Sequence, residues 1–115
     1  MDLETFEYEV RSALANLEYV QEVNISPRTP ISLKGIVKMR CDYTLSIFYN
    51  ASFFVLSFSL IFEQNRIWGV DRDNRIGWHI HPLSDPDWHQ PTDEKSVVEI
   101  ISLFDEVMQE FYKKT

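Results

Sequence analysis

All three histidines of this chain fall within one short stretch, at His79, His81 and His89. Side chains of a β-strand alternate between its two faces, so His79 and His81 project from the same face of a strand. Two imidazoles on one face can share a proton, a phosphate or a metal ion near neutral pH. We therefore expect any chemistry of this protein to lie in this stretch.

The residues before the histidines predict a β-hairpin. A three-residue turn over 72–74 would pair Asp71 with Arg75, Gly69 with Gly77 and Trp68 with Trp78. The apolar side chains of this hairpin then share the core face: Trp68, Val70, Ile76, Trp78 and Ile80. The opposite, open face holds the polar candidates for a site: Asp71, Arg75, His79 and His81. Paired glycines between them are typical of close approach by a ligand or another backbone.

Three interpretations of the open face are compatible with these residues. General acid–base chemistry would use His79 and His81 for proton transfer, Asp71 to orient an imidazole and Arg75 to hold a phosphate. A metal site would use the two histidines with Asp71 or His89 as a third ligand. Finally, all of these residues are also compatible with ordinary structural roles in a solvated strand and loop.

The expected register argues against the metal site. With Asp71 opposite Arg75, its carboxylate would lie about 13 Å from His79, at ~3.3 Å per residue of strand. His79 and His81 would then supply two ligands, whereas zinc takes three or four from protein. We therefore predict four catalytic residues and neither a metal nor another cofactor: His79, His81, Arg75 and Asp71.

The surrounding pattern predicts an α+β domain spanning residues 1–115. Apolar residues at helical spacing indicate a helix over 3–20, with Asp2 as its N-cap, and a second helix that begins near 92–94. Alternating segments between them indicate about five antiparallel strands: 33–41, 43–49, 53–62, 66–71 and 75–81. Both helices should cover one face of the sheet, in a two-layer sandwich.

Composition narrows the class of protein. Hydrophobic residues at 44% exclude a disordered chain, and the net charge of −7 makes nonspecific binding to nucleic acid unfavourable. No apolar run is long enough for a bilayer, and the acidic start lacks a secretory leader. The lone cysteine, Cys41, cannot form an internal disulfide. We expect a cytoplasmic protein without a membrane partner.

The segment from Trp68 to Pro82, with its Asp73-Asn74 turn and its His-x-His element, resembles the TumE-type toxin family of prokaryotic toxin–antitoxin modules. Chains of that family are small, and a Gly- and His-rich element follows an Asp-Asn turn and precedes a C-terminal amphipathic helix. The resemblance assigns Asp71 or Asp73 to the Asp-Asn element and extends over roughly residues 40–111. It implies a toxin with an antitoxin protein as its partner, and nuclease activity.

Two functions from different classes follow. The first is a toxin-like, metal-independent ribonuclease that acts on RNA at the open sheet face. The alternative is a noncatalytic protein-interaction module that binds a partner through that face or through the loop containing Trp88. The histidines favour the ribonuclease, whereas the acidic net charge favours the interaction module; the sequence predicts no oligomeric state.

Overall fold

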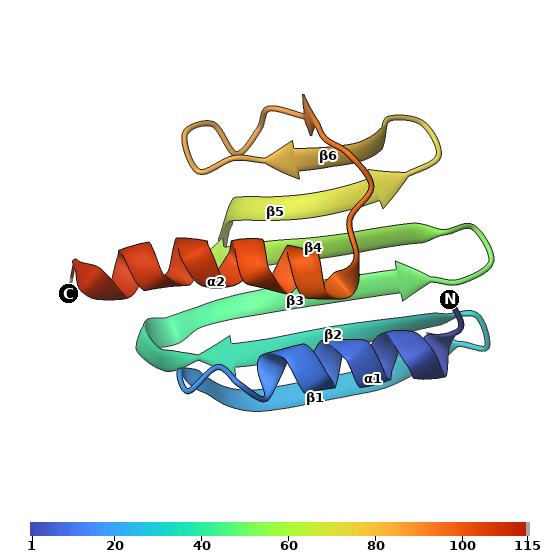
Figure 1. Cartoon of the computed structure of the whole chain (residues 1–115), viewed down its shortest axis with the longest axis horizontal. Coiled ribbons are helices and arrows are strands. Elements are labelled where there is room, and N and C mark those ends of the chain that lie inside the picture. The colour runs from blue at the N-terminus through green and yellow to red at the C-terminus, as the bar shows by residue number, and fades with distance from the viewer. Residues whose placement is uncertain (115) are drawn as a thin grey trace.

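Seven antiparallel β-strands, paired in chain order, form a single sheet in the computed structural model, which describes residues 1–114 (Figure 1). Two helices lie on the same side of this sheet. The strands are β1 (Val20–Thr29), β2 (Ser32–Met39), β3 (Tyr43–Asn50), β4 (Val55–Phe62), β5 (Asn65–Asp73), β6 (Gly77–His81) and β7 (Gln90–Pro91). The predicted α+β class, with N- and C-terminal helices on one face, is therefore confirmed.

Local capping sets where each helix begins. Helix α1 (Leu3–Leu14) starts at the predicted N-cap, where the Asp2 carboxylate accepts a 2.8 Å hydrogen bond from the Thr5 amide. Helix α2 (Val97–Lys113) starts at a capping box in which Ser96 and Glu99 bond each other's backbone amides. No helix within residues 1–114 combines the length and apolarity needed to cross a membrane.

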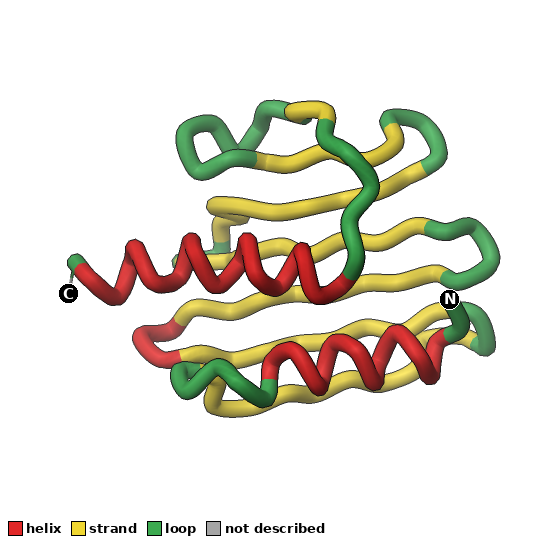
Figure 2. Tube along the Cα trace, viewed as in Figure 1, coloured by secondary structure: helices red, strands yellow, loops and turns green. Residues whose placement is uncertain are grey.

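Both helices are shorter than predicted. Helix α1 ends at Leu14 instead of continuing to 20, and α2 begins at Val97 instead of near 92–94. Residues 92–96 instead carry the chain from β7 across to the helix layer (Figure 2). The apolar spacing continues past the end of α1 because the non-helical residues Leu17 and Tyr19 also contact the core. Before α2 the polar residues 92–95 do not join the helix, because Ser96 is its N-cap.

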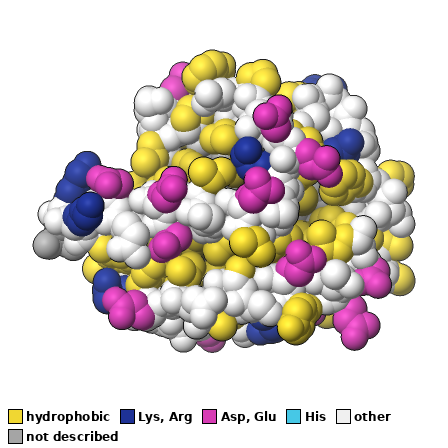
Figure 3. All heavy atoms as spheres, viewed as in Figure 1, with side chains coloured by type: hydrophobic (Ala, Val, Ile, Leu, Met, Phe, Trp, Pro, Cys, Tyr) yellow, Lys and Arg dark blue, Asp and Glu magenta, His cyan; other side chains and the backbone are white. Residues whose placement is uncertain are grey.

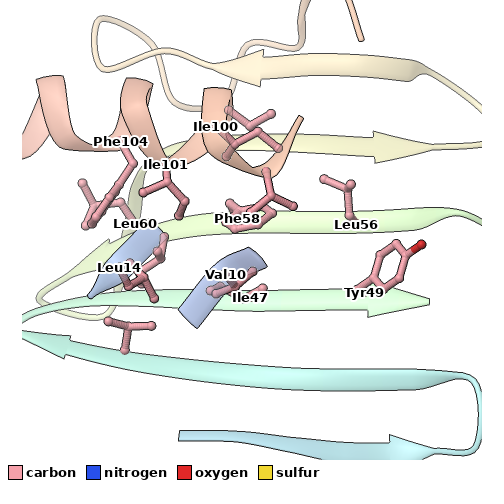
Figure 4. Close-up of a cluster of buried hydrophobic side chains, with 14 of the residues drawn as sticks. Val10, Leu14, Ile47, Tyr49, Leu56, Phe58, Leu60, Ile100, Ile101 and Phe104 are labelled. Atoms are coloured by element: carbon pink, nitrogen blue, oxygen red, sulfur yellow. The ribbon is translucent and has the colours of Figure 1, made fainter. Parts of the chain in front are cut away.

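The core lies between the helices and the middle of the sheet. Apolar side chains of both helices meet those of the central strands there (Figure 4), among them Val10, Leu14, Ile47, Phe58, Leu60, Ile100 and Phe104. The alternating residues Leu56, Phe58 and Leu60 of β4 face the helices, as the sequence predicts. Phe54, expected on the same face, precedes β4 with a positive φ of 50° and remains exposed.

The strand count of about five is too low because both edge strands were missed. Pro27 suggests a break in the sequence, but it lies in β1, an edge strand. An edge strand tolerates proline because its outward-facing backbone groups need no partner in the sheet. The other edge strand, β7, has only two residues and no alternating pattern to reveal it.

The register predicted for the β5–β6 hairpin is wrong. The turn spans residues 74–76, so that Asp71 lies opposite His79 and Gly69 opposite His81. The Asp73 carboxylate accepts hydrogen bonds from the backbone amides of residues 75 and 76, at 2.9 and 2.7 Å. These bonds hold the turn two residues later than predicted. Gly77 closes it with a φ of +81°, a conformation that glycine adopts readily.

This shift changes the pairs but keeps the faces, because side chains alternate with period two. Trp68 is buried against Phe104, with ring centroids 6.2 Å apart. Trp78 is not its cross-strand neighbour, as predicted, but lies opposite Arg72 and is half-buried. Ile76, expected in the core, lies in the turn and is exposed.

Candidate functional site

Four side chains on the sheet face opposite the helices form what we call the histidine cluster: Asp71, His79, His81 and His89. The observed register puts Asp71 beside both strand histidines. Its Oδ2 atom lies 3.1 Å from His81 Nε2 and 3.4 Å from His79 Nε2. The predicted separation of about 13 Å between Asp71 and His79 is therefore wrong, since it depended on the wrong register.

A guanidinium fixes the Asp71 carboxylate. Arg66 donates to both of its oxygens, at 2.7 Å to Oδ1 and 3.0 Å to Oδ2. Burial alone would raise the pKa of Asp71, but Arg66, with smaller effects from Ser57 and His81, outweighs burial and lowers this pKa below its usual value. Asp71 is therefore an ionised carboxylate at neutral pH.

Gly69 makes the contact between Arg66 and Asp71 possible. A Cβ atom at position 69 would lie 2.6 Å from Arg66 Cζ, far inside van der Waals contact. The sequence had suggested Gly69 and Gly77 as a cross-strand pair beneath a ligand. Instead Gly69 lies opposite His81, and its missing side chain gives space to the guanidinium.

Backbone carbonyls orient the two strand imidazoles. His79 Nδ1 lies 3.0 Å from the Gly77 oxygen, and His81 Nδ1 lies 2.7 Å from the Pro86 oxygen. A carbonyl oxygen only accepts, so each Nδ1 must carry the proton of the bond. Each Nε2 is therefore the nitrogen directed at Asp71. His79 and His81 are only 2% and 6% exposed, so these orientations are held in a buried setting.

The third imidazole comes from the loop 82–89, which folds back toward the strand histidines. The His89 ring centroid lies 5.2 Å from that of His79 and 4.8 Å from that of His81, and His89 itself is exposed. Figure 3 views the helix side, where acidic side chains follow α2 and the histidine colour is not seen. Because side chains alternate along β5, where Trp68 and Val70 face the core, the cluster lies on the opposite side of the sheet, with His89 at its boundary with solvent.

The structure brings together only part of the predicted site. His79 and His81 share a face as expected, and Asp71 lies closer to both than predicted, but Arg75 lies in the exposed turn between β5 and β6. The guanidinium at the cluster belongs to Arg66, which the sequence analysis missed because its role depends on the space above Gly69.

From the sequence, His89 was a possible third metal ligand or a structural loop residue, and it was left out of the four predicted catalytic residues. The grouping of all three histidines in one stretch was the signal that it belongs with the other two. The ligand atoms of His79, His81 and His89 lie within 4.8 Å of one another, close enough to surround one metal ion after a small movement. The same rings can transfer protons near neutral pH. Both chemistries are therefore open to this cluster.

Comparisons of the chain with protein-family models, curated proteins and solved structures gave no match.

Proposed function

We propose that this protein is the toxin of a toxin–antitoxin module and that it cleaves RNA at the histidine cluster. The observation that carries the proposal is the arrangement of the imidazoles: two are buried against one carboxylate oxygen, and a third lies beside them at the surface. The resemblance of the hairpin to TumE-type toxins supports the biological role and an antitoxin protein as partner.

Cleavage of RNA suits such a cluster because the substrate carries its own nucleophile. The 2′-hydroxyl attacks phosphorus, its oxygen–phosphorus bond forms, and the bond from phosphorus to the 5′-oxygen breaks. A base must take the proton of the 2′-hydroxyl, and an acid must protonate the leaving 5′-oxygen. The cluster would supply these proton transfers, with His89 as the member most accessible to a large substrate and Asp71 as a positioning residue.

The earlier reason for excluding a metal no longer applies. It depended on a remote Asp71 and on only two ligands, from His79 and His81. Asp71 and His89 both lie at the cluster, so the predicted metal independence of the reaction loses its argument from geometry.

The test is cleavage of a defined RNA by the tag-free protein, together with growth after expression in a bacterium. We expect a product ending in a 2′,3′-cyclic phosphate and no cleavage when the 2′-hydroxyl at the reactive position is replaced by hydrogen. His89→Ala should reduce cleavage by about 100-fold or more, the effect typical of losing a proton-transfer group. Trp88→Ala changes the neighbouring exposed residue of the same loop and is the control. Full activity of folded His89→Ala, or no cleavage by the wild type, would contradict the proposal.

A noncatalytic interaction module is the second candidate, and one feature of the helix side favours it. A groove of about 470 Å³ runs between α1 and α2, with Tyr8 72% exposed and Val98 60% exposed along it. Exposed apolar side chains grouped in this way often mark a surface that binds another protein. If this function is the correct one, Tyr8→Ser with Val98→Ser should abolish the cellular effect, whereas His89→Ala should leave it intact.

A further inference from the structure

We infer that the histidine cluster binds one divalent transition-metal ion, with zinc the most suitable, through ring nitrogens of His79, His81 and His89. Asp71 would act as the positioning and charge-balancing carboxylate. The inference concerns binding, so it holds or fails independently of RNA cleavage.

The distances fit a compact nitrogen-rich site. Zinc–nitrogen bonds of about 2.0–2.1 Å place neighbouring ligands of a tetrahedron about 3.3 Å apart. The Nε2 atoms of His81 and His79 already lie 3.1 and 3.4 Å from Asp71 Oδ2, which is the same spacing. The three histidine ligand atoms lie within 4.8 Å of one another, so no pair must close by more than about 1.5 Å. His89 is exposed and lies on a loop, so its ring has the most room to adjust.

The hydrogen-bond pattern creates a position between the rings that suits a cation. Because Nδ1 of His79 and of His81 donates to a carbonyl, a neutral ring at either position directs the lone pair of Nε2 at Asp71. Two lone pairs and a carboxylate oxygen then face one another, and all three are acceptors. A metal ion bound to both nitrogens turns this repulsion into attraction.

The carboxylate beside the rings also suits a bound cation. Neutral imidazoles bind a divalent ion through their lone pairs, and Asp71 would balance part of its charge. The Arg66 bond holds Asp71 in place while the two histidines converge on it.

Features around the three rings match those of known metal sites. Histidines that bind metals usually donate their other ring N–H to a backbone carbonyl or a carboxylate, which fixes the tautomer and the direction of the ring. His79 and His81 both do so, through Gly77 and Pro86. Imidazole nitrogens suit zinc, nickel, copper and iron, whereas magnesium and calcium take oxygen ligands. The site should therefore discriminate strongly against magnesium.

The inference also adds one step to the proposed cleavage of RNA, and only this added step rests on the proposed function. Three protein ligands leave a coordination position for water, and zinc lowers the pKa of such a water to about 7. In the metal-bound protein that water, instead of an imidazole of the cluster, would be the base that removes the proton of the 2′-hydroxyl.

The test is titration of chelator-treated, tag-free protein with zinc chloride by calorimetry, followed by elemental analysis. We expect one zinc per chain, a dissociation constant in the micromolar range or tighter, and no response to magnesium chloride. His89→Ala removes an exposed ligand and should weaken zinc binding by at least 30-fold with an unchanged fold. Trp88→Ala, on the same loop, should bind as the wild type does. His81→Ala, checked for folding by circular dichroism, should lose stoichiometric binding.

Cobalt(II) gives a second measurement that does not depend on stability. Its visible spectrum should show the intense bands of a low-coordinate nitrogen site, and these should disappear in His89→Ala. Absence of stoichiometric zinc, or equal affinity in the wild type and His89→Ala, would overturn the inference. If zinc-free protein cleaves RNA at the wild-type rate, the metal has no part in the reaction, although it still binds. If the protein binds zinc but does not cleave RNA, the proposed ribonuclease function is wrong and the metal site stands.

Discussion

The two faces of the sheet are covered in different ways. On one face α1 and α2 bury a continuous apolar core that includes Phe58 and Phe104, both fully inaccessible. On the other face, beside β6, a loop without regular structure approaches the two buried histidines, and the Pro86 carbonyl oxygen accepts a hydrogen bond from His81. We conclude that the helix face provides stability, whereas the loop face holds the polar groups on which the proposed function depends.

The physical basis of this difference is the nature of the buried groups. Burying one large apolar side chain contributes about 1.5–3 kcal/mol. Burying an imidazole or a carboxylate is unfavourable unless hydrogen bonds replace those to water, and each such group of the cluster has them. Well-packed apolar side chains in the same place would stabilise the fold at least as well, so stability alone does not explain this arrangement.

The largest expected effect tests the helix face. Phe104→Ala removes a ring at the centre of the core and should lower the free energy of unfolding by about 3–5 kcal/mol, because a cavity remains. Urea unfolding measures the change, and Leu103→Ala, at a partly buried position of the same helix, is the matched control with a smaller loss. A loss below about 1 kcal/mol would mean that the helices contribute little, and the contrast between the faces would disappear.

The second prediction exchanges glycine for alanine once on each face. Gly69→Ala should push Arg66 away from Asp71, lower the free energy of unfolding by about 1–3 kcal/mol and weaken zinc binding. Gly35→Ala places the same methyl group beneath the helices, 3.3 Å from Ile25 Cγ1. It should change stability without changing zinc affinity. Equal zinc affinity in both variants would show that Arg66 does not position the cluster.

The two faces also differ in how well sequence predicts them. The α+β class, the N-cap at Asp2 and the inward-facing residues of β4 follow from local rules of capping and alternation, so they were predicted correctly. Turns over 72–74 and 74–76 both leave Asp71 on the open face, so alternation could not decide which residue lies opposite it. The position of the turn depended on the hydrogen bonds that the Asp73 carboxylate accepts from two backbone amides.

The remaining parts of the site depend on contacts that no local pattern encodes. Arg66 reaches Asp71 only because position 69 has no side chain, and His89 reaches the cluster only because an irregular loop returns to the sheet. The residue types of the site could therefore be predicted from the stretch that contains them, whereas their arrangement could not.

A third prediction concerns alkaline pH on the helix face. Burial and then the hydrogen bond to Asp105 raise the pKa of Tyr19, whose hydroxyl donates to that carboxylate at 2.7 Å. A raised pKa contributes stability that is present below the unfolded value of about 10 and is lost as pH rises toward the folded value. Tyr19→Phe should cost about 1 kcal/mol at pH 7 and should make the loss of stability above pH 10 less steep. Tyr8→Phe, at a highly exposed position, is the control; identical slopes in all three proteins would contradict this account.

The smallest expected effect concerns Arg75, which the sequence placed beside the histidines as a phosphate ligand. The structure places it in the exposed turn between β5 and β6. Arg75→Ala should therefore change the free energy of unfolding by less than about 0.5 kcal/mol and should not affect zinc affinity. If RNA is the substrate, cleavage should change by no more than the effect of Arg28→Ala, an exposed arginine on the distant edge strand β1. A loss of cleavage specific to Arg75→Ala, with an unchanged KM for a dinucleotide and a raised KM for a longer RNA, would show that Arg75 binds a phosphate remote from the reacting one. An equal loss on both substrates would place Arg75 at the reacting phosphate, and the separation of the hairpin turn from the cluster would then have to close when RNA binds.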